Sequence, residues 1–279
     1  MRPGEAGPGR RDRQRGAYRR VIAGLHFEAH GPSDATPMIM SAGLGGAGAY
    51  WRPNLAALAE RHRVILYDHR GTGRSDRALP SAVSVADMAD DVIALMDGLG
   101  LDRSHFVGHA AGGLVGLMLA VRAPERLASL VVVNGWTRLD PHFARCFEAR
   151  LALLRDTGPS AYLRAQPIFI YPAAWSSEHH DELDAELDDQ LAHFQGRDNL
   201  EKRIAALQAF HLDDRLGEVA TPLLAIAARD DMLVPWTCTP AYAERIAGAK
   251  TVLMDWGGHA CNVTDPDAFN RHVLDFLRS

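Results

Sequence analysis

One short turn motif, Val107-Gly-His-Ala-Ala-Gly-Gly113, constrains the fold of this chain more than any other part of its sequence. Apolar residues predict a buried strand over residues 104–107 before the turn, and helical spacing predicts a helix over 112–122 after it. A strand that enters a helix through Gly-x-x-x-Gly has the form of a nucleophile elbow, whose central residue is normally serine. The central residue here is Ala110. Because a methyl group has no lone pair, no covalent acyl intermediate can form at this turn.

Strand and helix patterns alternate along most of the remaining chain. The apolar run at residues 127–133, broken only by Ser129, is typical of a parallel strand that is buried on both faces. The alternation predicts an α/β fold with a mostly parallel central sheet that is flanked by helices. Further strands are expected at residues 24–30, 38–42, 64–67, 222–227 and 250–254, and further helices at 51–60, 84–99, 239–247 and 265–277.

Residues 138–216 break the alternation, because they hold helical patterns and charged runs but no strong strand pattern. They are expected to form a helical cap, inserted after about the sixth strand, while residues 21–137 and 217–279 form the core. Binding sites in such sheets lie at the carboxyl ends of the strands. Five aromatic residues in or beside the cap are candidates to line that site or to pack inside the cap: Trp136, Phe169, Tyr171, Trp175 and Phe194.

The N-terminal arm, residues 1–20, carries seven arginines against Glu5 and Asp12, whereas the whole chain has a formal net charge of −5. A basic arm can bind nucleic acid or a membrane, but the glycines, the prolines and the lack of an apolar stripe favour a disordered extension. The acidic body also argues against a polyanionic partner. We therefore expect no nucleic-acid and no membrane partner, while the assembly state, including a homodimer, stays open.

Composition favours a cytoplasmic protein without a disulfide framework. The cysteines are few and odd in number, and their spacing does not predict a metal site. No apolar stretch has the length of a membrane span, and no apolar core follows the first arginines as it does in a secretory signal. The three cysteines are Cys146, Cys238 and Cys261.

Two further strand ends carry candidates for a catalytic triad in the chain order nucleophile, acid, histidine, which is the order of the α/β-hydrolase fold. The acid is expected after the strand at 222–227, where Asp231 has the better position and Asp230 is the alternative. The histidine is expected after the last strand, where His259 follows two glycines. The carboxylate would hold one tautomer of the imidazole and stabilise its protonated form.

Backbone N–H groups supply the oxyanion hole of this fold, so the alanine at the elbow does not remove it. One donor is expected at Ala111, directly after the elbow residue, and the other at Leu44, in the glycine-rich loop after the strand at 38–42. Asp68 is expected to brace the turn at residues 71–73 rather than to react, because aspartate readily accepts hydrogen bonds from nearby N–H groups.

The missing nucleophile limits the chemistry. Removing the serine of a working triad costs about 10⁶ in kcat, whereas the remaining parts still give roughly 10³–10⁴ over water. That is enough for a labile substrate that needs a proton moved or a water molecule oriented. The alternatives are a catalytically silent binding protein, a cofactor-free lyase or oxygenase that uses the His–Asp pair, and an esterase whose serine was replaced in the laboratory. His109 or Ser41 as a substitute nucleophile is a further alternative.

Six segments within residues 41–266 resemble the RutD family, α/β-hydrolase-fold proteins of the Rut pathway for uracil breakdown. This family also carries alanine at the elbow, so the resemblance implies that Ala110 is the natural residue. The segments are Ser41-Ala-Gly-Leu-Gly-Gly-Ala-Gly-Ala-Tyr-Trp51, Tyr67-Asp-His-Arg-Gly-Thr-Gly73, Val107-Gly-His-Ala-Ala-Gly112, Val133-Asn-Gly-Trp136, Ala192-His-Phe-Gln-Gly196 and Gly257-Gly-His-Ala-Cys-Asn-Val-Thr-Asp-Pro266.

The resemblance implies a small-molecule substrate, carbamate or aminoacrylate, whose hydrolysis releases ammonia in pyrimidine catabolism, with no metal and no organic cofactor. It also implies that His259, tuned by Asp231, moves a proton to or from the substrate nitrogen or an attacking water molecule. The N–H groups of Leu44 and Ala111 would hold the substrate oxygen. Both substrates decompose spontaneously, which agrees with the argument from the missing nucleophile.

Overall fold

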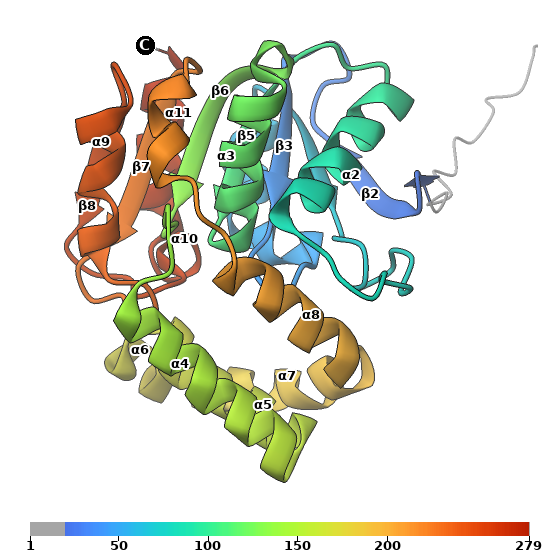
Figure 1. Cartoon of the computed structure of the whole chain (residues 1–279), viewed down its shortest axis with the longest axis vertical. Coiled ribbons are helices and arrows are strands. Elements are labelled where there is room, and N and C mark those ends of the chain that lie inside the picture. The colour runs from blue at the N-terminus through green and yellow to red at the C-terminus, as the bar shows by residue number, and fades with distance from the viewer. Residues whose placement is uncertain (1–19, 279) are drawn as a thin grey trace, which may run out of the picture.

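A computed structural model of the chain describes residues 20–278, and at its centre lies a sheet of eight strands (Figure 1). The strands are β1 (Arg20–Ile22), β2 (Leu25–His30), β3 (Pro37–Ser41), β4 (Arg63–Tyr67), β5 (Ser104–His109), β6 (Leu127–Val133), β7 (Leu223–Ala228) and β8 (Lys250–Met254). Their order in the sheet is β1-β2-β4-β3-β5-β6-β7-β8. β2 pairs antiparallel with β1 and β4, and the other neighbours are parallel. The predicted, mostly parallel sheet is confirmed.

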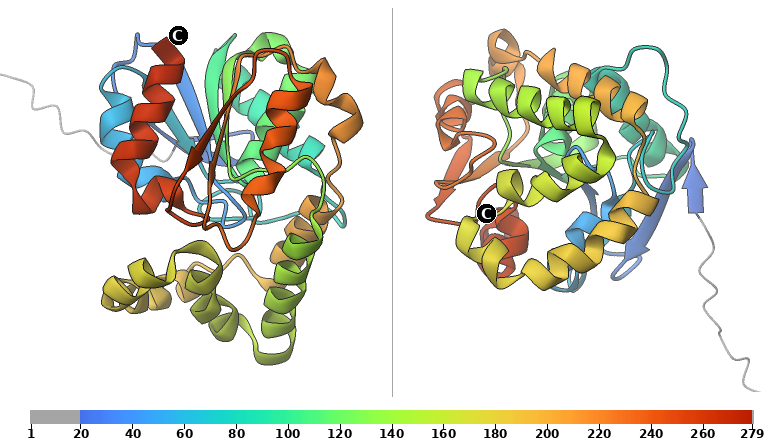
Figure 2. Two further views of the ribbon diagram at one scale, coloured as in Figure 1. Left: turned by 90° about the vertical axis from the view of Figure 1, so that its left-hand side faces the viewer. Right: turned by 90° about the horizontal axis from the view of Figure 1, so that it is seen from below.

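Helices cover both faces of this sheet. They are α1 (Arg52–Ala59) and α11 (Pro266–Arg278) on one face, and α2 (Val85–Gly98), α3 (Ala111–Arg122) and α9 (Pro240–Arg245) on the other. Figure 2 (left) shows α11 and α9 on opposite sides of the strands. Successive side chains of a strand point to opposite faces, so Met38 and Met40 pack with the first helix pair and Ile39 packs with the second group.

The start of α2 follows from a capping box, which the sequence places at residue 84. The Ser84 Oγ accepts a hydrogen bond from the Asp87 N–H at 3.2 Å, and the Asp87 carboxylate accepts one from the Ser84 N–H at 2.8 Å. Two N–H groups that a helix start leaves without partners are thereby satisfied. The apolar face of the helix, including Val92 and Leu95, is fully buried against the sheet.

A helical insertion lies between β6 and β7, which confirms the cap that was predicted after about the sixth strand. Figures 1 and 2 show it below the strand ends, apart from the helices that cover the sheet. Its helices are α4 (Pro141–Ala152), α5 (Pro159–Ile170), α6 (Ala173–Glu178), α7 (His180–Ala192) and α8 (Arg197–Gln208). Shorter elements are η1 (Gly48–Trp51), η2 (Pro124–Arg126), η3 (Leu153–Thr157), η4 (Asp213–Glu218), η5 (Trp236–Cys238) and α10 (Cys261–Thr264).

The first strand, β1, has no counterpart in the sequence prediction. With three residues it is too short to show an alternating pattern, and it joins the sheet by antiparallel pairing with β2. Arg20, the last residue of the expected disordered arm, begins this strand, and residues 1–19 of that arm lie outside the described residues. Among the helices of the described chain, none has both the length and the apolar character that crossing a membrane requires.

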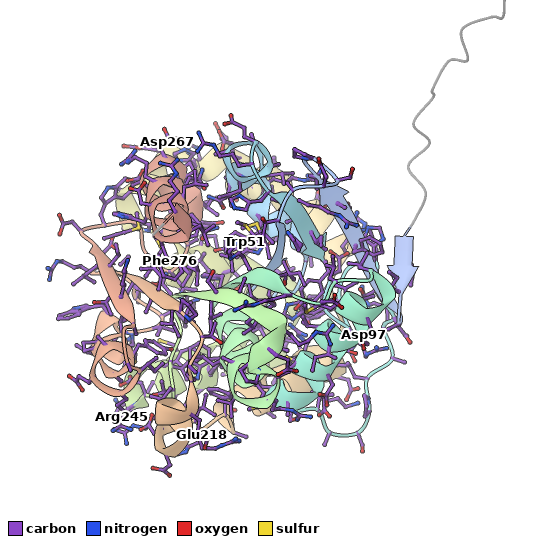
Figure 3. All side chains as sticks on the ribbon, turned by 90° about the horizontal axis from the view of Figure 1, so that it is seen from above. Trp51, Asp97, Glu218, Arg245, Asp267 and Phe276 are labelled. Carbon is purple, nitrogen blue, oxygen red and sulfur yellow. The ribbon has the colours of Figure 1, made fainter. Side chains whose placement is uncertain are left out.

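Side chains divide between interior and surface as these patterns require (Figure 3). Trp51 is fully buried, and its ring centroid lies 6.1 Å from that of Phe269 on α11. The carboxylates of Asp97 and Glu218 are exposed at the rim. The Trp51–Phe269 contact ties α11 to the beginning of α1, and so anchors the segment that follows the last strand.

Candidate active site

The elbow between β5 and α3 has the strained backbone of a nucleophile elbow, with a methyl group at its apex. Ala110 has φ +46° and ψ −110°, a conformation that residues other than glycine rarely adopt. The two flanking glycines permit the sharp turn. An added Cβ at Gly108 would lie 2.2 Å from the Gly112 carbonyl oxygen, and one at Gly112 would lie 2.2 Å from the Ser41 carbonyl oxygen. The glycine spacing of the motif is therefore a steric requirement of this turn.

A buried histidine–aspartate pair lies beside the elbow. The Nδ1 of His259 is 2.8 Å from the Oδ2 of Asp231, and the two side chains are 3% and 0% exposed. The other carboxylate oxygen of Asp231 accepts hydrogen bonds from the N–H groups of Leu233 (2.8 Å) and Val234 (2.9 Å). Because the carboxylate occupies Nδ1, the Nε2 of His259 is the nitrogen that remains for the cavity above Ala110.

Asp230, the alternative acid, has a different partner. Its Oδ1 accepts a hydrogen bond from the Gly258 N–H at 2.9 Å. Gly257 and Gly258 have φ +131° and +65°, so the loop that carries His259 depends on glycine at these positions. The structure brings Asp231 and His259 together, whereas Asp230 binds the backbone of the loop that carries His259.

His109, which the sequence offered as an alternative nucleophile, lines the cavity and binds the backbone of the loop that carries His259. Its Nε2–H and the Asn134 side-chain N–H both donate to the His259 carbonyl oxygen, each at 2.7 Å. The His109 ring centroid lies 4.7 Å from that of His259, and its Nδ1 is buried without a partner in the described chain. Since Nε2 carries the proton, Nδ1 is a buried hydrogen-bond acceptor beside Gly43.

The two expected oxyanion donors lie at the same cavity. Leu44 and Ala111 both line it. Ala111 is the first residue of α3, so its N–H belongs to the four that an α-helix leaves without an intrahelical acceptor. The Leu44 carbonyl oxygen accepts hydrogen bonds from Arg203 (3.3 Å) and Gln195 (3.4 Å), which hold the loop from the cap side. This arrangement fits two N–H groups that act on one substrate oxygen.

Asp68 and Ser41 lie outside the cavity lining. The Asp68 carboxylate accepts hydrogen bonds from the Gly48 N–H (2.8 Å) and the Arg74 N–H (2.9 Å), so it braces the glycine-rich turn as expected. Ser41 forms hydrogen bonds with the Tyr67 hydroxyl at 2.8 Å and the His69 Nε2 at 2.9 Å. Both side chains therefore support the strand ends from within the core.

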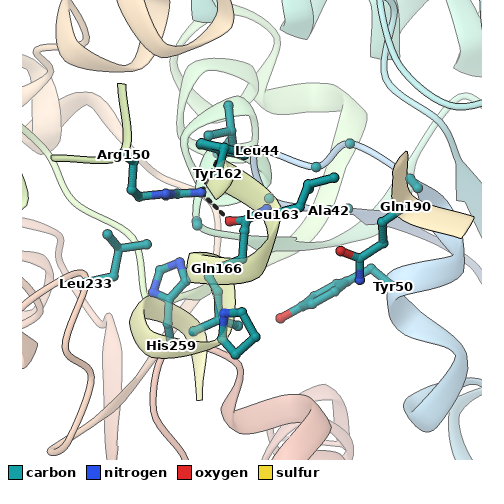
Figure 4. A pocket seen from close by; sticks show the side chains of 18 of the residues that line it. Ala42, Leu44, Tyr50, Arg150, Tyr162, Leu163, Gln166, Gln190, Leu233 and His259 are labelled. Carbon is teal, nitrogen blue, oxygen red and sulfur yellow. Dashed lines mark hydrogen bonds between the residues drawn. The ribbon is translucent and has the colours of Figure 1, made fainter. Parts of the chain in front are cut away.

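A cavity of about 540 Å³ separates the cap from the elbow (Figure 4). Three of the five aromatic candidates line it, and two do not. Phe169 instead packs near the Arg150 guanidinium, and Trp175 stacks on Tyr171 and His179 within the cap. These two residues take the second of the two predicted roles, packing inside the cap, because the packing of the cap helices decides which aromatic faces point to the core. The lining aromatic candidates are Trp136, Tyr171 and Phe194.

Arg150 is a lining residue that the sequence patterns did not indicate. It lies on α4 and is 3% exposed, and it lines the cavity opposite the elbow. Helical spacing places it on one face with Phe143, Phe147 and Leu154. An arginine in the middle of an apolar helix face was the signal that could have identified it. Among residues 20–278, no group of three or more potential metal ligands is found.

Two histidines behind the site make the fold sensitive to acid. Between pH 7 and pH 5 these two rings together are expected to reduce the free energy of unfolding by about 4 kcal/mol, measured by urea denaturation. Burial lowers the pKa of His69 well below its usual value, helped by the charge of Arg203, and burial does the same for His109, helped by His259. The unfolded chain protonates both below about pH 6.5. Their stabilisation is therefore present above that pH and is lost at about 1.4 kcal/mol per unit per ring as the pH falls.

The control for this prediction is an exposed histidine. His69→Asn keeps a neutral polar side chain and is expected to lower the slope between pH 6.5 and 5 by the share of one ring, about 1.4 kcal/mol per pH unit. His180→Asn, on the exposed surface of the cap, should keep the full slope. If His69→Asn retained the full slope, a different group would have to carry the acid sensitivity.

The chain is similar to known proteins over most of its length. A family model described as the alpha/beta hydrolase fold matches residues 36–168. A protein from Variovorax paradoxus, named "Putative carbamate hydrolase RutD", is 52% identical over 91% of this chain and 96% of its own. A Caulobacter sp. protein of the same name is 52% identical over 92% and 97%. The solved structure of the enol-lactonase from Burkholderia xenovorans LB400 is 27% identical, with a TM-score of 0.84 over 92% of this chain and 98% of its own.

Proposed function

The chain belongs to the RutD family of α/β-hydrolase-fold enzymes, and from that premise we propose that it hydrolyses a small, labile C–N substrate and releases ammonia. Carbamate is the first candidate, since the relatives are named for it. The observation that carries this proposal is the elbow itself. Ala110 replaces the nucleophile, while the His259–Asp231 pair and the two oxyanion donors are kept around it. These parts can move a proton and stabilise an oxyanion, but they cannot form an acyl-enzyme.

The proposed reaction needs no covalent intermediate. His259 Nε2 takes a proton from a water molecule, which adds to the substrate carbon, and the N–H groups of Leu44 and Ala111 stabilise the oxygen that becomes negative. The protonated ring then returns the proton to the substrate nitrogen, and the C–N bond breaks. For carbamate the products are ammonia and bicarbonate. Asp231 keeps Nδ1 protonated, so that Nε2 is a base at the start of each cycle.

The labile substrate fits the energetic limit of this site. Losing the nucleophile of a triad costs about 10⁶ in kcat, or about 8 kcal/mol of barrier at ~1.4 kcal/mol per factor of ten. A substrate that decomposes without help needs only the proton transfer and the oxyanion donors, which supply roughly 10²–10⁴. This agreement supports a role in nitrogen release, and we place that role in pyrimidine catabolism.

Aminoacrylate is the second candidate, and the size of the cavity favours it. Carbamate has four non-hydrogen atoms, whereas the cavity of about 540 Å³ is walled largely by apolar side chains of the cap and elbow. A three-carbon acid with an amino group fills such a space better and can undergo the same proton transfers. Water would then add to the carbon that bears the nitrogen, with ammonia again as the leaving group.

The test is ammonia release from freshly prepared carbamate and aminoacrylate. The wild-type protein is expected to accelerate release at least about 10²-fold over buffer for one of them, and His259→Ala should fall back to the buffer rate because the base is gone. His180→Ala, on the exposed surface of the cap, is the matched control and should keep the wild-type rate. Equal rates for buffer, wild type and His259→Ala would leave a catalytically silent binding protein as the better interpretation.

A further inference from the structure

One cationic side chain of the cavity has a hydrogen-bond donor without an acceptor. Arg150 is 97% buried, and its Nη2 donates to the Tyr162 hydroxyl at 2.7 Å and to the Gln166 Oε1 (Figure 4). The Nε–H is buried and has no partner among the described residues. Over residues 20–278, no carboxylate lies within ion-pair distance of this guanidinium. A buried arginine of this kind is unusual, because buried charges are normally paired.

Aromatic rings offset part of the desolvation cost but leave the donors free. The guanidinium carbon lies 5.2 Å from the Tyr162 ring centroid, 5.7 Å from that of Phe169 and 6.0 Å from that of Phe147. Such contacts contribute about 0.5–2 kcal/mol each at most. They hold the guanidinium in place without neutralising it, and arginine does not lose its proton in proteins.

The carboxylates near the cavity are engaged elsewhere or lie at its exposed side. Asp231 accepts three hydrogen bonds from His259 and two backbone N–H groups. Asp184 and Asp189 are exposed residues of α7 that line the cavity, and Asp189 pairs with His193 at 3.1 Å. The charge of Arg150 is thus left for a group that enters the cavity.

We propose that Arg150 binds the carboxylate of the substrate, and that this carboxylate is a different group from the carbon that reacts above Ala110. The inference rests on the proposed function and specifies its substrate class. His259 and the oxyanion donors act at the elbow, whereas Arg150 projects from the cap into the same cavity. Carbamate has one carboxylate, whose carbon is the reacting atom, and it cannot occupy both places. A short acid that carries its labile nitrogen at the far end can.

The ligand class is therefore a short monocarboxylate, recognised by charge-assisted hydrogen bonds. These bonds are roughly twice as strong as neutral ones, and arginine suits carboxylates because of its planar fork of N–H groups. An amide of the same shape keeps one oxygen acceptor but lacks the charge. The difference in affinity between an acid and its amide measures what Arg150 contributes.

The experiment is calorimetric binding of propanoate and propanamide, which needs no turnover. Wild type is expected to bind propanoate at least about tenfold more tightly than propanamide. Arg150→Gln should lose that preference and keep its weak affinity for propanamide, and Arg150→Lys should keep part of it. Arg145→Gln is the matched control, because Arg145 is an exposed arginine of the same helix, α4, and does not line the cavity. It should keep the preference.

Two results would overturn the assignment. One is equal affinity of wild type for the acid and the amide. The other is a preference for propanoate that Arg150→Gln retains, which would place the carboxylate at the oxyanion donors. If Arg150→Gln does not fold, the assignment is still tested by Arg150→Lys and by the affinities of wild type for propanoate and propanamide. If Arg150→Gln released ammonia at the wild-type rate, the proposed function would stand and this inference would be contradicted. If Arg150→Gln lost propanoate binding but the wild-type protein hydrolysed neither substrate, this inference would stand and the proposed function would fail.

Discussion

Ala110→Ser is expected to convert this protein into an esterase, with kcat/KM for p-nitrophenyl acetate raised by about 10³ or more. Nucleophile removal costs about 10⁶ in an optimised triad, and we expect only part of that to return in a cavity built for another substrate. The serine Oγ would stand at the apex of a turn that already has φ +46°. It would lie beside the free Nε2 of His259 and the N–H groups of Leu44 and Ala111. A burst of p-nitrophenol, and an acetyl adduct on the quenched protein, are the measurements.

The controls separate an installed nucleophile from a hydroxyl that is merely added to the cavity. Ala47→Ser introduces the same group elsewhere in the lining and should remain at the wild-type rate. Adding His259→Ala to Ala110→Ser should abolish the gain, because the hydroxyl then has no base. A correctly folded Ala110→Ser protein that forms no acetyl adduct would show that His259 is not aligned with the elbow.

The sequence pattern predicted those elements whose conformation is determined by residues close together in the sequence. The elbow depends on two glycines whose replacement would bring a Cβ to 2.2 Å from backbone oxygens, so its signature is confined to five consecutive residues. The runs that became β6 and β8 were predicted with the bounds that the structure has. β6 is an inner strand of the covered parallel sheet and is almost entirely buried, whereas β8 lies at the edge of the sheet and is exposed at its first two residues. The positions of Asp231 and His259 followed from the order of strand ends, not from any property of the two residues.

The role of Arg150 and the partner of His109 were not predicted, because both depend on contacts between distant parts of the chain. His109 reaches the His259 carbonyl across 150 positions, and nothing in its local sequence indicates that partner. Arg150 enters the cavity because α4 and α5 pack with their aromatic faces around it. Phe169 and Trp175 were predicted either to line the site or to pack inside the cap, and the structure shows them packed inside the cap. Cap packing is tertiary in origin, and a helical period alone leaves open which helix covers which face.

Asp231→Asn is expected to reduce kcat by about 10⁴ in the Ala110→Ser background, and to bring ammonia release in the Ala110 protein to within a few-fold of the buffer rate. The amide oxygen can still accept from the N–H groups of Leu233 and Val234, so the loop should keep its shape. The amide nitrogen, however, would donate to His259 Nδ1 and force the proton to Nε2. The ring would then have no lone pair to present to a water molecule or to a serine hydroxyl.

The adjacent residue supplies the matched control for this last prediction. Asp230→Asn changes the same functional group, one position away, where the carboxylate accepts from the Gly258 N–H at 2.9 Å and does not touch the imidazole. Its amide oxygen can accept the same hydrogen bond, so kcat should stay within about tenfold of the parent protein, because one hydrogen bond contributes roughly 0.5–1.5 kcal/mol and ~1.4 kcal/mol is a factor of ten. If the two variants lost activity equally, loop position rather than the tautomer of His259 would be the property that the acid controls. A large loss confined to Asp231→Asn, together with unchanged melting temperatures, assigns the carboxylate to the proton transfer.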